Sequence, residues 1–108
     1  MDYTENSKTQ ELAMVIIANS GEAKGLAFQA LRTMRETKDL EKAKELLKEA
    51  NHYIHEAHVG QTELLTMTAK GEEVGIDVLL IHSQDHLMTT MMAAELIEEM
   101  ILMMEERK

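Results

Sequence analysis

The chain has no proline among its 108 residues and only five glycines. Proline breaks helices because it lacks a backbone N–H and clashes with the preceding turn, so its absence permits long helices. Ala, Leu, Glu, Lys and Met are abundant, and all five have high helix propensity. Aromatic residues make up only 3% of the chain, so the core must be packed from aliphatic side chains and methionines. The sequence therefore predicts an all-α protein.

Apolar residues recur every three to four positions in three segments, which predicts three helices. The polar segments Thr37–Leu40 and Lys70–Gly75 separate them, and Asp39 is expected to cap the second helix. Short connections place consecutive helices side by side in opposite directions. We therefore predict one domain, residues 1–108, folded as an antiparallel three-helix bundle. The predicted helices cover about residues 9–36, 40–69 and 77–106.

Two parts of the N-terminal third depart from the helical pattern. Residues 1–8 are polar and are expected to form a frayed leader. Asn19, Ser20 and Gly21 follow one another inside the first helix, and none of them favours a helix interior. A kink or a short break is expected there.

The third predicted helix is apolar on two opposite faces. At about 100° per residue, Asp85 lies in the middle of one of them. A helix that is apolar on both faces is buried on both, yet a bundle of three helices covers only one. The uncovered face predicts a closed homo-oligomer with this helix near its axis. The Asp85 face contains Val78, Ile81, Thr89, Met92, Leu96 and Met103, and the opposite face contains Leu80, Leu87, Ala94 and Ile101.

Asp85 is therefore either a metal ligand or a carboxylate on an exposed edge. Burying an unpaired carboxylate is costly. In a symmetric oligomer, the Asp85 carboxylates would meet and repel one another unless a cation lay between them. Oxygen ligands of this kind favour Mg²⁺ or Ca²⁺. The alternative, that Asp85 faces solvent or bonds to a neighbouring hydroxyl, is equally compatible with the spacing.

Two histidines flank this carboxylate. His82 offers a ring nitrogen as a nucleophile or a ligand, although a lone histidine on a semi-apolar helix face is more often structural. Gln84 and His86 lie on either side of Asp85, at about 100° from it. Either could orient the ring of His82 or face solvent.

The remaining histidines lie on the second predicted helix. His52, His55 and His58 are three residues apart, so together they span too wide an arc to bind one ion. No zinc site is expected there. His58 and Gln61, one turn apart, are the candidate site residues of this helix.

Charge and composition exclude several classes of function. The net charge of −9 argues against nucleic acid and anionic membrane surfaces as partners. The absence of cysteine excludes disulfides and thiolate metal sites and is compatible with a reducing compartment. The N-terminus lacks a signal-peptide pattern, and no apolar run approaches the ~18 residues of a membrane span. A cytoplasmic protein without membrane insertion is expected.

Residues 82–89, His-Ser-Gln-Asp-His-Leu-Met-Thr, closely resemble a known signature. It is the His-Ala-Gln-Asp-His-Leu-Met-Thr motif of the lactose/cellobiose-specific enzyme IIA of the bacterial phosphoenolpyruvate-dependent sugar phosphotransferase system. Residues 57–65 look like the Ala-His-x-x-Gln-Thr-x-Leu segment of that family, and residues 20–24 are similar to its small-residue stretch. The resemblance extends from about residue 10 to residue 106.

The resemblance implies a homotrimer in which His82 is the phosphorylated nucleophile. It implies that Asp85 meets its symmetry mates around a metal, usually Mg²⁺, at the three-fold axis. The phosphoryl group would arrive from the phosphocarrier protein HPr and leave to a cysteine of the cognate enzyme IIB. The protein would thus be a phosphotransferase component for disaccharide uptake of the cellobiose, lactose or chitobiose type. Four further residues match the motifs and are expected to support His82, namely Gln84, His86, His58 and Gln61.

Two functions of other classes compete with this interpretation. A non-catalytic, metal-stabilised helical adaptor or scaffold would form a metal-dependent oligomer without being phosphorylated. A metal-dependent hydrolase is disfavoured because too few carboxylates converge on His82. The sequence leaves the transported sugar open, since selectivity for sugar is expected in the membrane component.

Overall fold

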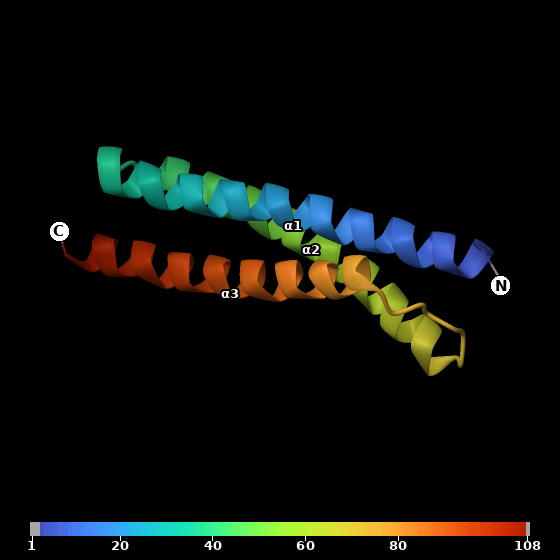
Figure 1. The fold of residues 1–108 in the computed structure, drawn as a ribbon. Helices are drawn as coiled ribbons and strands as arrows, with labels where there is room; N and C mark the ends of the chain where they lie inside the picture. The colour runs from blue at the N-terminus through green and yellow to red at the C-terminus, as the bar shows by residue number, and fades with distance from the viewer. Residues whose placement is uncertain (1–2, 108) are drawn as a thin grey trace.

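The computed structural model describes residues 3–107, with side chains from Lys8 onward. It contains the helices α1 (Tyr3–Thr37), α2 (Leu40–Ala69) and α3 (Val78–Glu106), and no strand among the described residues. The helices run up, down and up again and form a rod with extents of 60 × 19 × 19 Å (Figure 1). The predicted antiparallel three-helix fold is confirmed.

Local hydrogen bonds end α1 and start α2. Lys38 has a φ of 57°, and its N–H donates to the Met34 carbonyl at 3.0 Å. This left-handed residue is a common C-terminal stop for a helix. The Asp39 carboxylate then accepts a hydrogen bond of 3.0 Å from the backbone N–H of Lys42. The predicted N-cap at Asp39 is confirmed.

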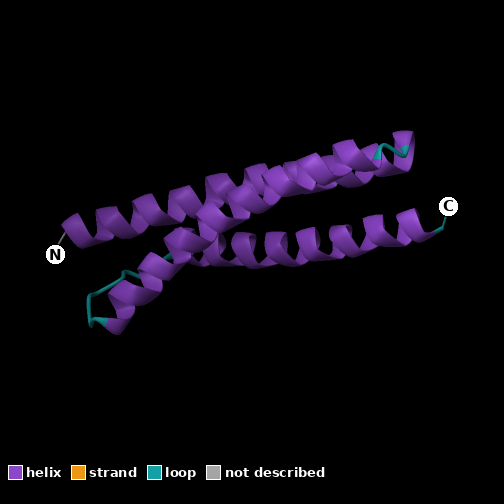
Figure 2. Cartoon of the chain, turned by 180° about the vertical axis from the view of Figure 1, so that it is seen from behind, coloured by secondary structure: helices purple, strands orange, loops and turns teal. Residues whose placement is uncertain are grey.

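The connection between α2 and α3 sets where α3 begins. The C-terminal end of α2 projects past the start of α3, and residues 70–77 lead the chain back (Figure 2). Gly71 has a φ of 80°, a left-handed conformation that costs glycine little. The Asp77 carboxylate accepts a hydrogen bond of 2.8 Å from the N–H of Leu80 and caps α3. This cap places His82 one turn after the first residue of α3.

The N-terminal helix differs from its prediction in two places. It begins at Tyr3, so most of the segment expected to be a frayed leader is helical, while residues 1–2 lie outside the described residues. It also runs uninterrupted through residues 19–21, so of the two expectations there, a kink or a short break, the break is wrong. The Asn19 side-chain amide donates to the Val15 carbonyl at 2.9 Å, within the helix. Ser20 is fully buried, and its hydroxyl has no hydrogen-bond partner among the described residues.

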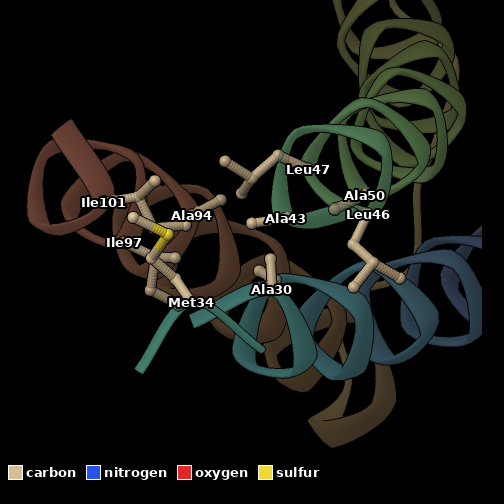
Figure 3. Close-up of a cluster of buried hydrophobic side chains, with 10 residues drawn as sticks. Ala30, Met34, Ala43, Leu46, Leu47, Ala50, Ala94, Ile97 and Ile101 are labelled. Atoms are coloured by element: carbon tan, nitrogen blue, oxygen red, sulfur yellow. The ribbon is translucent and has the colours of Figure 1, made fainter. Parts of the chain in front are cut away.

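The core is built largely from alanine. Larger side chains complete the core at the end of the bundle where α1 joins α2. At this end Met34 of α1 contacts Ile97 and Ile101 of α3 (Figure 3). At the other end, Gly60 of α2 is buried so close to Ile16 that a Cβ at position 60 would lie 3.1 Å from the Ile16 Cγ1 atom. The buried alanines are Ala13, Ala23, Ala27, Ala30, Ala43, Ala50, Ala57 and Ala94.

Only one of the two apolar faces of α3 is covered within the chain. Leu87, Ala94 and Ile101 are buried against the other helices. On the opposite face, Met92 is 63% exposed and Leu96 is 53% exposed. The prediction of two apolar faces is confirmed, and oligomerisation stays a prediction. None of the helices in residues 3–107 is long and apolar enough to span a membrane.

Candidate functional site

His82 and His86 form a pair on the second and third turns of α3. Their ring centroids are 5.7 Å apart, and the ring planes are inclined at 47°. The His82 side chain is exposed, whereas His86 is half-buried. An accessible imidazole beside a more constrained one suits a nucleophile with a supporting group. Two of the predicted site residues are therefore neighbours.

The His86 ring is held between α3 and α1. Its Nδ1 atom lies 3.3 Å from the hydroxyl oxygen of Thr90, one turn further along α3. Its Nε2 atom faces Gly21 of α1, where an added Cβ would lie 3.9 Å away. The pair His82–His86 therefore belongs to the flank of α3 that borders α1.

Gln84 and Gln61 form a second pair, on the flank of α3 that borders α2. The Gln61 side-chain amide donates a hydrogen bond of 2.7 Å to Gln84 Oε1. Gln84 Nε2 donates to the Ser83 hydroxyl at 3.3 Å, and this hydroxyl donates to the Leu80 carbonyl at 2.6 Å. Both ends of the Gln84 amide are thus held in place.

Asp85 lies between these flanks, on the uncovered face of α3. Its side chain is exposed and makes no hydrogen bond or ion pair with the described residues. Exposed Ile81, Met88 and Met92 surround it in helical register. No three His, Asp or Glu side chains between residues 3 and 107 converge on a possible metal position.

His58 stands apart from the other candidates. It is exposed on α2, one turn before Gln61, and no hydrogen bond or ring contact among the described residues joins it to His82. The predicted site residues therefore form two pairs on opposite flanks of α3, with Asp85 between them. His58 lies outside both pairs.

Sequence reasoning missed Ser83 and Thr90, which hold Gln84 and His86. Both are buried. Thr90 could have been found from its spacing of four residues from His86, which places the two side chains on one side of a helix. Ser83 lies on the covered face, where a hydroxyl gives no signal in an apolar pattern.

A cavity of about 310 Å³ lies beside the Gln61–Gln84 pair, between the end of α2 and the start of α3. Leu64, Leu65 and Leu80 are among its lining residues, so its wall is mainly apolar. Ile76, on the connection, is 82% exposed at its edge. The surface next to the site is thus suited to contact with apolar groups of another protein.

Residues 11–105 match the family described as "PTS system, Lactose/Cellobiose specific IIA subunit". Over 105 residues, the chain is 38% identical to the N,N'-diacetylchitobiose-specific EIIA component of Escherichia coli strain K12, covering 97% of this chain and 90% of that protein. Other relatives are named for lactose, galactose and cellobiose.

Solved structures agree with this match. PtcA from S. mutans superposes with a TM-score of 0.90 at 39% identity, covering 97% of this chain and 99% of that one. The IIA(Chitobiose) chain of a complex with HPr, from Escherichia coli, gives a TM-score of 0.75 at 35% identity, with 91% and 94% covered. Three findings indicate the same family: the signature with its paired histidines on α3, the matching three-helix fold and the nearly complete coverage. The chain belongs to the lactose/cellobiose-specific IIA family of the sugar phosphotransferase system.

Proposed function

We propose that this IIA component carries a phosphoryl group on His82, accepting it from phosphorylated HPr and passing it to a cysteine of the cognate enzyme IIB. The observation that carries the proposal is the exposed His82 ring, paired with His86 at 5.7 Å on α3. A relative of the same fold has been solved in complex with HPr, which supports HPr as the donor.

The chemistry requires a free ring nitrogen at His82. In the first step its lone pair attacks phosphorus, the new phosphorus–nitrogen bond forms, and the phosphorus–nitrogen bond to the donor histidine breaks. In the second step a cysteine thiolate of enzyme IIB attacks, and the bond to His82 breaks as the phosphorus–sulfur bond forms. Because the transferred group is anionic, catalysis depends on position and on hydrogen-bond donors.

The uncovered face of α3 supports a homotrimer. Exposed Met92, Leu96 and Met103 continue the face along the helix beyond Asp85. Rotational symmetry about an axis along α3 brings the α1 flank of one copy against the α2 flank of the next. The histidine pair of one copy would then face the Gln61–Gln84 pair of its neighbour. The trimer would thereby assemble each site from two copies.

Asp85 fits a shared cation in such a trimer. Each copy contributes one exposed carboxylate from the middle of the uncovered face, and oxygen donors of this kind suit Mg²⁺. Asp85 of each copy would hold the ion, and the ion would neutralise charges that otherwise repel at the axis.

The sugar served is proposed to be a disaccharide of the cellobiose, lactose or chitobiose type. The supporting observation is that relatives of similar identity are named for lactose, cellobiose and N,N'-diacetylchitobiose. A phosphoryl carrier does not contact sugar, so the site residues carry no selectivity between these sugars.

The test is phosphorylation of the purified protein by phosphoenolpyruvate, enzyme I and HPr. We expect an acid-labile adduct that His82→Ala abolishes and His55→Ala retains, because His55 is exposed on α2 and away from the pair. Transfer onward to candidate enzyme IIB proteins then identifies the acceptor. An adduct that persists in His82→Ala contradicts the assignment of His82. A wild-type protein that forms a metal-dependent oligomer but no adduct would instead support the adaptor.

A further inference from the structure

Thr90 differs from four other threonines in the partner of its hydroxyl. The hydroxyls of these four donate to the backbone carbonyl four residues earlier, at 2.7 to 3.0 Å. The Thr90 hydroxyl instead lies 3.3 Å from Nδ1 of His86, and Thr90 is only 1% exposed. The four threonines are Thr37, Thr66, Thr68 and Thr89.

We propose that Thr90 is a positioning residue that keeps the ring proton of His86 on Nε2, so that His86 can donate a hydrogen bond to a phosphoryl group on His82. This inference rests on the proposed function of His82. It assigns a purpose to a buried hydroxyl that lies outside the sequence signature.

The burial of Thr90 favours donation by its hydroxyl over acceptance. A hydroxyl carries one proton to donate, and a buried donor without an acceptor is destabilising. Nδ1 of His86 is the hydrogen-bond partner of the Thr90 hydroxyl among the described residues. If the hydroxyl donates to Nδ1, this nitrogen holds a lone pair, and in the neutral ring the proton must be on Nε2.

The surroundings of Nε2 allow it to serve a ligand. It lies beside Gly21 of α1, which has no side chain, whereas a Cβ at this position would be in van der Waals contact with Nε2 at 3.9 Å. The centroids of the His82 and His86 rings are 5.7 Å apart, so a group attached to His82 would lie near the His86 ring. Phosphoryl oxygens are acceptors only. An N–H at Nε2 would attract them, whereas a lone pair there would repel them.

The first measurement is the tautomer of His86, read from ¹⁵N shifts of the histidine rings in the unphosphorylated protein. We expect the proton on Nε2 in wild type and in Thr90→Ser, which keeps a hydroxyl. In Thr90→Val, which keeps the shape but removes the hydroxyl, we expect a mixture of tautomers. A wild-type His86 with its proton on Nδ1, or a Thr90→Val variant with an unchanged tautomer, would overturn the inference.

The second measurement is the rate of phosphoryl transfer from HPr. Loss of one neutral hydrogen bond predicts that Thr90→Val slows the transfer about fivefold, with rescue by Thr90→Ser. Thr66→Val is the matched control, because the hydroxyl of Thr66 bonds to the Thr62 carbonyl, away from the site. Its rate should equal that of wild type. Circular dichroism checks that all variants keep their helices.

The two proposals fail in different ways. If His82 of the wild type is not phosphorylated at all, the proposed function fails, while the tautomer measurement still reports on Thr90. If His82 is phosphorylated at equal rates in wild type and Thr90→Val, the role of Thr90 is wrong and the function of His82 stands.

Discussion

Gln61 of α2 donates a hydrogen bond of 2.7 Å to Gln84 of α3, on the flank of α3 that faces away from His82. The candidate residues of one chain are thereby divided into two groups that do not touch. A site that needs both groups requires two copies of the chain. This division connects the chemistry of α3 to the proposed trimer.

Gln61→Leu should reduce the free energy of unfolding by about 1 kcal/mol, because Gln84 Oε1 loses its donor while half-buried. Urea denaturation at fixed protein concentration measures the change. Gln29→Leu is the control, since Gln29 is exposed on α1 and its replacement should change stability by less than about 0.5 kcal/mol. Equal effects of the two substitutions would mean that the Gln61–Gln84 bond adds nothing.

Asp85→Leu should keep the proposed trimer and raise its stability. Asp85 is exposed in the single chain but would be buried between subunits in the proposed trimer. Replacing a buried charge by an apolar side chain is often stabilising by about 1–4 kcal/mol. Sedimentation equilibrium gives the mass. Leu96→Asp, on the same face, should produce monomers because it adds an unpaired charge there. A monomeric Asp85→Leu would show that a metal bridge, rather than apolar packing, holds the subunits together.

Removal of divalent cations should lower the melting temperature of the wild type, by about 1–2 °C per kcal/mol of lost stability for an assembly of three copies. In the proposed trimer, the Asp85 carboxylates would repel one another at the axis without a cation. Thermal unfolding with and without a chelator measures the shift. Asp85→Leu should show none, and an equal shift in this variant would place the cation elsewhere.

Gly60→Ala and Gly25→Ala should change stability in opposite directions. Both glycines are helical, so each alanine gains about 0.5–1 kcal/mol of helix propensity. At position 60 the new Cβ would meet the fully buried Ile16 at 3.1 Å, and overpacking of this kind costs about 1–3 kcal/mol. Position 25 has no atom within 4 Å of the new Cβ. Urea denaturation of both variants decides whether α1 and α2 pack as closely as described.

Asp77→Ala should cost about 1 kcal/mol of stability because the first turn of α3 loses its cap. Asp77→Ser should retain most of the stability of the wild type, since the serine hydroxyl can accept the same hydrogen bond from the N–H of Leu80. Amide hydrogen exchange at the start of α3 is the more direct measurement, and we expect faster exchange in Asp77→Ala alone. Unchanged exchange would mean that packing, not the cap, starts the helix.

The helices and the faces of α3 were predictable because their causes are local. Asp39 and Asp77 cap α2 and α3 by accepting hydrogen bonds from N–H groups three residues later. Burial follows the helical period of about 3.6 residues, which puts Leu87 on the covered face of α3 and Asp85 on the uncovered face. The break expected at residues 19–21 did not occur. Weak helix propensity in these residues was overridden by packing, since Ser20 is fully buried.

The pairings within the site were only partly predictable. His82 and His86 share one helix, so their spacing alone brings them together. The contact of Gln61 with Gln84, and the separation of His58 from the others, depend on how α2 is rotated against α3. A repeating pattern of apolar residues defines which side of a helix is inside, but not which polar residue at its edge meets a partner.

The chemistry of α3 is confined to its first third, while its uncovered face continues to the other end of a rod 60 Å long. Beyond Thr90 the proposed contact between subunits would require only apolar side chains on this face, and the exposed Met92, Met100 and Met103 meet that requirement without any special shape. During divergence, the distal part can therefore drift through many apolar sequences. Related components in one cell could in this way come to prefer their own copies over one another's, with no change at the histidines.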